Sequence, residues 1–256
     1  MSIKTKYNPL GGRSNDRFPE LEMWRYANTG TPRKTVLYEY LGNNWDEVIN
    51  VPYCDGKTVI NQANPFNNNN TPFKNNTNVQ YVDLYNVPFT NNNMYSAFSG
   101  CSNLVGVYNI SNNTIDMGET FNKCYNFNQN IRIPDSVTNM ANAFHYCNNF
   151  NQSMTIPNNV TNMANAFFYC SNLKANIQIF SPVVTDATNC FRQGGAKNVQ
   201  IPYYYLSSTG AIIAKTQTFN SFVAAGYVDD NGNSLNQHSV TITLTNIYIH
   251  KKEDLI

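Results

Sequence analysis

Residues 137–144 read Val-Thr-Asn-Met-Ala-Asn-Ala-Phe, and residues 160–167 repeat the same eight residues 23 positions later. A weaker copy follows at residues 184–191. Three sets of apolar residues recur at intervals of 23 positions, and we call each set a column. They are Met94, Met117, Met140 and Met163; Phe98, Phe121, Phe144 and Phe167; and Cys101, Cys124, Cys147 and Cys170. A unit this short and polar cannot bury enough apolar surface alone. The period therefore predicts units that stack on one another.

The spacing of apolar residues within one unit predicts two elements. Met140, Phe144 and Cys147 follow i, i+4, i+7 spacing, which is typical of one face of a short helix. Met154 and Ile156 alternate with polar residues, which predicts a short strand with both side chains pointing inward. The predicted fold class is an α+β repeat solenoid whose 23-residue units each hold a short helix and a short strand, flanked by small β caps.

Composition divides the chain into four segments. They are an extended N-terminal arm at residues 1–33, a β cap with an Asn-rich linker at 34–80, the repeat solenoid at 81–205, and a C-terminal β cap at 206–256. The open ends of a stack expose apolar columns, so closing modules are expected. Strands in the last segment are predicted at residues 211–217, 222–225 and 239–249.

The repeated motif is similar to one that is known in bacterial surface proteins. Val-Thr-Asn-Met, a Phe, a Cys and Phe-Asn-Gln follow one another across residues 137–152, and part of the pattern returns at 117–129. Over about residues 81–205 the chain resembles the BspA-like leucine-rich repeat, including its mycoplasma lipoprotein branch. The resemblance implies a short leucine-rich-repeat-like solenoid that serves adhesion or protein contact, with no catalytic centre.

Charge and polarity exclude several classes of partner. The net charge is +1 and 45 of the 256 residues are asparagine, so amides supply most of the polarity. Nucleic acids and anionic membranes are bound largely through clustered Lys and Arg, so neither is expected as a partner. No apolar run approaches the roughly 18 residues of a membrane span. Charged residues interrupt residues 1–20, so no ordinary secretory signal is predicted there.

The reactive side chains form no pattern that indicates catalysis. Cysteines at one repeat position would lie about 4.8 Å apart, beyond the roughly 3.5–4.5 Å between disulfide Cβ atoms, so buried free thiols are predicted. No Cys-x-x-Cys pair supports a zinc site. His145, His238 and His250 stand in no catalytic motif. We therefore predict no enzyme activity, no catalytic or cofactor-binding residue, no cofactor and no metal.

One set of aromatic residues is a candidate binding surface. Stacking should bring His145-Tyr146 beside Phe168-Tyr169 as an aromatic strip, with Tyr203, Tyr204 and Tyr205 further along. Aromatic faces among amides bind sugars or protein partners, because rings contribute contact area and amides contribute hydrogen bonds. The alternative interpretation, which we favour at this point, is that half of these rings pack against the neighbouring helix.

Three functions fit these observations. The first is a non-enzymatic structural or host-contact component of a phage virion, in the tail, collar, head decoration or fibre. It would be made in the host cytoplasm and docked on other virion proteins through residues 1–33 and 206–256, as part of a homo-oligomer or larger assembly. Its repeats would face outward, toward a cell-surface protein or glycan. The alternatives are an adhesin on the bacterial cell surface that binds host protein or glycan, and an intracellular protein-interaction scaffold.

Overall fold

The computed structural model describes residues 37–40, 44–47, 59–61, 73–84, 92–196, 198–207, 209–235 and 240–249. The arm predicted at residues 1–33 lies outside these ranges, as does most of the predicted linker. Strands and turns dominate the described residues, which contain a single α-helix, α3 (Gln217–Ala224). No helix described there is long and apolar enough to cross a membrane.

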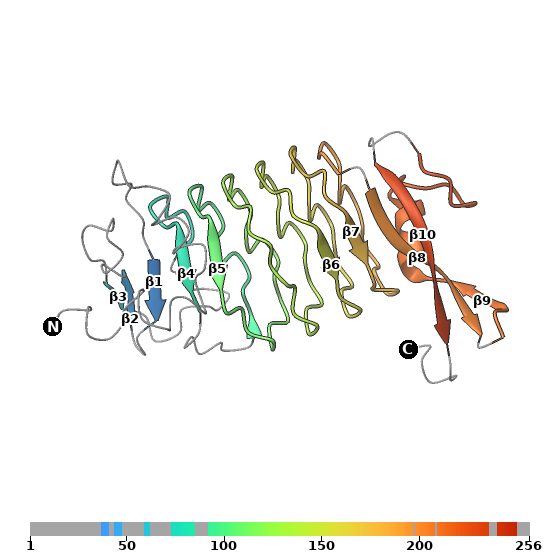
Figure 1. The fold of residues 1–256 in the computed structure, drawn as a ribbon, viewed down its shortest axis with the longest axis horizontal. Coiled ribbons are helices and arrows are strands. Elements are labelled where there is room, and N and C mark those ends of the chain that lie inside the picture. Colours follow the sequence, from blue (N-terminus) through green and yellow to red (C-terminus); the bar gives the residue numbers. More distant parts are fainter. Residues whose placement is uncertain are drawn as a thin grey trace, which may run out of the picture.

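The strands form two separate sheets (Figure 1). The first has the order β3-β2-β1-β4-β5, and the second has the order β10-β8-β7-β6 with β9 paired to β8. Parallel pairing links β1, β4 and β5, and also links β6, β7, β8 and β10. The strands are β1 (Leu37–Tyr40), β2 (Asn44–Glu47), β3 (Val59–Asn61), β4 (Tyr81–Asp83), β5 (Gly106–Tyr108), β6 (Met154–Ile156), β7 (Ile177–Ile179), β8 (Asn198–Ser207), β9 (Ile212–Lys215) and β10 (Thr241–Ile249).

The 23-residue units lie side by side along the long axis of the molecule (Figure 1). One parallel β-bridge per step joins them, through Asn93, Asp116, Asn139, Asn162 and Asp186. Inside the stack, phenylalanine rings of neighbouring units lie with their centroids 5.3–5.8 Å apart, in the order Phe73, Phe98, Phe121, Phe144, Phe167 and Phe191. The apolar columns read from the sequence therefore form one continuous core.

The predicted α+β solenoid is wrong, because the segment expected to be a helix in each unit is a series of turns. A helix would require Phe144 N–H to bond the carbonyl of Met140. Instead this N–H donates to the Ala166 carbonyl of the next unit at 2.8 Å. Its neighbour Ala143 donates to Met140 O at 3.0 Å, closing a turn. Alternate N–H groups are thus shared between the turn and the next unit, which leaves no i→i−4 ladder.

Two residues in the turn segment of each unit adopt a left-handed backbone that a right-handed helix excludes. In the unit that follows residue 139 they are Asn142 (φ 56°) and Tyr146 (φ 60°). Equivalent positions in other units include Glu119 (φ 53°) and Lys123 (φ 61°). The i, i+4, i+7 spacing therefore does place Met140 and Phe144 inward, but on a turning backbone whose inward face has nearly the same spacing as a helix.

The strand predictions have mixed outcomes. The strand at Met154–Ile156 is confirmed, with Met154 and Ile156 buried and the residue between them exposed. The strand predicted at residues 222–225 is wrong, because most of that segment belongs to α3. The Thr216 hydroxyl caps this helix by accepting a hydrogen bond from Phe219 N–H at 3.1 Å.

Helix α3 and the turn after it close the C-terminal end of the stack. Phe191 N–H, which has no further unit to bond, donates to the Tyr227 hydroxyl at 2.8 Å. Helix α3 is also tied to the last unit, because Val184 N–H donates to the Thr218 hydroxyl of α3 at 3.0 Å. The Phe222 ring lies 6.5 Å from that of Phe191 and covers the last ring of the column. The Tyr227 side chain therefore replaces the main-chain partner that a further unit would supply.

Asparagine side chains form ladders along the stack. The Asn126 amide donates to Asn103 Oδ1 at 3.2 Å, Asn149 donates to Asn126 at 3.1 Å, and Asn172 donates to Asn149 at 3.4 Å. In another column, Asn139 Oδ1 accepts the N–H of the residue two positions on, at 3.0 Å. The abundance of asparagine thus has a structural role, since an amide can both donate and accept from one unit to the next.

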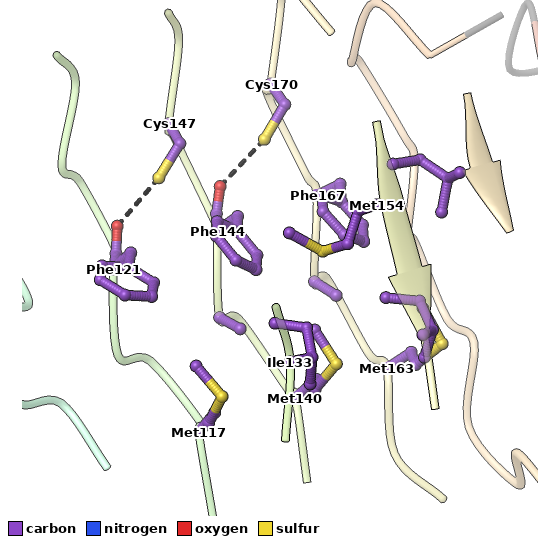
Figure 2. Packing of buried hydrophobic residues seen from close by; sticks show 14 of the residues in the cluster. Met117, Phe121, Ile133, Met140, Phe144, Cys147, Met154, Met163, Phe167 and Cys170 are labelled. Atoms are coloured by element: carbon purple, nitrogen blue, oxygen red, sulfur yellow. Dashed lines mark hydrogen bonds between the residues drawn. The ribbon is translucent and has the colours of Figure 1, made fainter. Parts of the chain in front are cut away.

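Buried thiols run parallel to the phenylalanine column (Figure 2). Four cysteines each donate to the main-chain carbonyl of the phenylalanine one unit back, as Cys147 does to Phe121 at 3.0 Å and Cys170 does to Phe144 at 3.0 Å; the other two are Cys101 and Cys124. The cysteines in the described ranges are free thiols. Burial raises the pKa of Cys101 from its ordinary value of 9.0 to about 12, and it raises the pKa of Cys124 and Cys147 as well.

We expect Phe144→Ala to lower the free energy of unfolding by about 3–5 kcal/mol, because it leaves a cavity between two stacked rings. Phe144 is fully buried, whereas Tyr125 is 43% exposed, so Tyr125→Ala should change stability by only about 0.5 kcal/mol. Urea unfolding followed by circular dichroism measures both. Equal losses for the two variants would contradict the packed column.

We also expect stability to fall as the pH rises above 9.0. In the unfolded chain the thiols ionise near their ordinary pKa of 9.0, while the pKa of Cys101 in the folded chain is about 12. The stabilisation is therefore complete below pH 9.0 and is lost progressively as the pH approaches 12. Urea midpoints across this range test the prediction, and Cys147→Ala should make the decline shallower. A midpoint that stays constant above pH 9.0 would contradict it.

Candidate functional site

Four of the predicted aromatic residues lie together on the turns of two adjacent units. The rings of His145 and Phe168 stack with centroids 5.1 Å apart, and those of Tyr146 and Tyr169 stack at 4.7 Å with only 7° between their planes. All four side chains are partly exposed. We call these four residues the aromatic strip. Its rings both pack on one another and present surface to solvent.

The two tyrosines of the aromatic strip occupy left-handed backbone positions. Tyr146 has φ 60° and Tyr169 has φ 58°. Other units place Gly100, Lys123 or Gln193 at this position, so the turn itself does not require an aromatic residue. A bulky side chain in this region costs on the order of 1 kcal/mol. The rings offset this cost through stacking and leave an apolar area at the surface.

His145 is held neutral at its place in the strip. Its Nδ1 lies 3.1 Å from Asn122 Oδ1, and its ring stacks on Phe168. Desolvation by burial, and then the positive charge of Lys123, hold the pKa of His145 below 6.5. The strip therefore presents an uncharged imidazole at neutral pH.

The remaining predicted residues belong to a different part of the molecule. Tyr203, Tyr204 and Tyr205 lie on β8. The Tyr204 hydroxyl donates to the Tyr203 hydroxyl at 3.0 Å, and the two ring centroids are 3.8 Å apart. Tyr203 also packs on Phe219 of α3, with centroids 4.5 Å apart. Tyr203 therefore joins β8 to α3, and the three tyrosines lie on a strand whereas the aromatic strip lies on the turns, so the seven predicted residues form two groups.

Sequence reasoning missed a groove on the face that carries the strands. Three adjoining hollows of about 490, 250 and 600 Å³ all include Arg132 in their walls. We call their union the Arg132 groove. One feature of the sequence could have indicated it. A charged residue, Arg132, occupies the repeat position that holds the uncharged Thr155 and Gln178 in the next two units.

The described part of the chain offers no metal centre. No three His, Cys, Asp or Glu side chains within it lie close enough together to hold an ion. The aromatic strip and the Arg132 groove supply rings, amides, hydroxyls and an exposed ion pair between Arg132 and Asp135. These groups are suited to recognition by contact and hydrogen bonding.

We expect Lys123→Ala to raise the pKa of His145 toward 6.5, because it removes the neighbouring positive charge while leaving burial unchanged. The pKa can be followed by NMR of the imidazole carbons during a pH titration. His238 and His250 are the other two histidines of the chain and act as internal references. A pKa of His145 at or above 6.5 in the unmodified protein would contradict the burial of this ring.

Comparison with known proteins identifies the repeat region. The family model described as "Mycoplasma protein of unknown function, DUF285" matches residues 60–180 and 92–205. No curated protein and no solved structure matches the chain. The two matches overlap across the stacked units and together cover more than half of the 256 residues. The chain therefore belongs to the Mycoplasma family of unknown function DUF285.

Proposed function

We propose that this chain is a non-enzymatic contact protein, and that its aromatic strip binds a protein partner. The observation that carries the proposal is the pair of ring stacks, His145 on Phe168 and Tyr146 on Tyr169, held partly exposed on adjacent turns. Tyrosine and other aromatic residues are enriched at protein interfaces, where they bury large areas with little loss of side-chain freedom.

The surroundings of the strip favour a protein partner. In the preceding unit, Asn122 and Lys123 occupy the positions that His145 and Tyr146 hold in the strip. In the following unit, Arg192 occupies the position that Phe168 holds. An apolar centre with a polar rim is the usual anatomy of a protein interface. The backbone adds rigidity, because each strip residue donates its N–H either to a turn or to the next unit. A rigid strip loses little conformational entropy on binding.

The family and the repeat motif favour a cell-surface setting. The chain belongs to a Mycoplasma family, and its motif resembles the BspA-like surface repeat that is used in adhesion. We therefore propose adhesion to a cell-surface protein as the function. The virion setting rests mainly on residues 1–33, which lie outside the described ranges, and it stays a prediction. The scaffold alternative has no specific observation in its favour.

The test uses the full chain carrying a fluorescent label and cultured epithelial cells, before and after mild protease treatment of the cells. We expect binding to untreated cells and its loss after protease. The double variant Tyr146→Ala/Tyr169→Ala should bind at least about tenfold more weakly, because interface aromatics each contribute on the order of 2 kcal/mol. Ile212→Ala is the control, since Ile212 is 63% exposed on β9, away from the strip.

A crosslinking experiment identifies the contact directly. A photoreactive phenylalanine analogue at position 146 should form an adduct with a cell-surface protein, and the same analogue at position 212 should not. Absence of cell binding would contradict adhesion. Binding that survives protease, or that survives loss of both tyrosines, would contradict a protein partner at the strip.

A further inference from the structure

The two sheets meet at a segment that belongs to neither. Strand β5 begins two residues after Leu104, whereas β6 begins four residues after Phe150 at the equivalent place in its unit. The strands therefore occupy different positions along the unit on the two sides of residues 129–133. Among the described residues, no main-chain partner bonds residues 131–133. On the β5 side, Val107 N–H donates to the Gln129 side-chain oxygen at 2.6 Å in place of a main-chain carbonyl.

This change of register produces the Arg132 groove. Ile131 and Ile133 stay buried and anchor the segment, while the Arg132 side chain is 73% exposed. The two larger hollows, of about 490 and 600 Å³, share Arg132 and Thr155 in their walls. Both volumes fall in the range of roughly 300–1,000 Å³ that small-molecule sites occupy.

Hydroxyl and amide groups dominate the wall of the 490 Å³ hollow. Around Arg132 it carries Asn130, Ser153, Thr155, Asn176 and Gln178. Gln178 is fixed in place, since its amide donates to Gln200 Oε1 at 3.0 Å. Amides and hydroxyls both donate and accept hydrogen bonds, which matches a ligand whose own hydroxyls do the same.

The charges in the groove favour a neutral ligand. Arg132 Nη2 lies 2.6 Å from Asp135 Oδ2, and the side chains are 73% and 74% exposed. The net charge of this pair is zero, so an anionic ligand would have to displace Asp135 and then face its negative charge. A pair of neighbouring sugar hydroxyls can instead accept from the guanidinium and donate to the carboxylate without separating them.

Phe180 supplies the apolar part of the 600 Å³ hollow. It follows β7, and its side chain is 52% exposed beside Pro157 and Thr155. Its N–H donates to Ile156 O at 2.9 Å, which fixes the backbone below the ring. An exposed aromatic ring on a fixed backbone offers a flat apolar face to the C–H side of a pyranose, while the polar groups around it bond the hydroxyls.

We propose that the Arg132 groove binds a neutral saccharide, with a sugar ring on Phe180 and hydroxyls bonded to the Arg132–Asp135 pair and the amides beside it. This site is separate from the aromatic strip, and it does not rest on the adhesion proposed above.

The test is saturation-transfer NMR on the full chain, with maltotriose, cellotriose and lactose as neutral probes and sialyllactose as an acidic one. We expect transfer to at least one neutral sugar, strongest at its C–H face. Phe180→Ala and Arg132→Ala should each weaken that binding at least about tenfold. Both changes are at exposed side chains, so urea midpoints should stay at the wild-type value. Tyr125→Ala removes a ring that is 43% exposed and lines none of the three hollows, so it should bind normally.

The proposal is overturned if none of the neutral sugars receives transfer, or if sialyllactose alone binds. It is also overturned if Phe180→Ala and Arg132→Ala both bind like the unmodified chain. Loss of sugar binding in Tyr146→Ala/Tyr169→Ala with retention in Phe180→Ala would place the sugar on the aromatic strip instead. That outcome overturns the groove and leaves protease-sensitive cell binding as the separate test of the strip.

Discussion

The sharing of main-chain hydrogen bonds between neighbouring units is the constraint on which the structure depends. In the turn segment, every second N–H donates to a carbonyl of the next unit, as Phe144 does to Ala166 at 2.8 Å. A buried N–H without a partner is costly, so a unit alone would leave these donors unsatisfied. The stack must therefore be closed at its end, and the Tyr227 hydroxyl supplies the missing partner of Phe191 N–H there.

The same constraint explains the unusual composition. Each side chain that faces a neighbouring unit meets its own equivalent one step away. Asparagine can bond to another asparagine in such a column, as Asn149 does to Asn126. Phenylalanine stacks on phenylalanine, and a cysteine thiol reaches the carbonyl one unit back. Identical residues recur because each position meets the same neighbours at every unit, whether an equivalent side chain or a main-chain carbonyl.

The two candidate sites lie where the repeat carries additional aromatic rings or where its strand register changes. The aromatic strip places rings at a turn position that elsewhere holds Gly100 or Lys123, so it adds surface without changing the backbone. The Arg132 groove lies where the strands of one sheet stop matching those of the other. A change of register leaves main-chain groups and side chains with fewer partners inside the fold, and these are then available to a ligand.

The sequence by itself determined the repeat, its buried columns and the strand at Met154–Ile156. It also placed His145 next to Phe168, because a fixed period puts equivalent positions side by side. It did not determine the backbone of the turns, since the spacing of Met140 and Phe144 suits a helix and a series of turns with left-handed residues equally well.

The Arg132 groove could not be foreseen for a related reason. Apolar spacing shows which side chains point inward, but the hydrogen-bond register between neighbouring units is a property of pairs of segments. Only the tertiary structure decided that β5 and β6 would begin at different places in their units and leave residues 129–133 between two sheets.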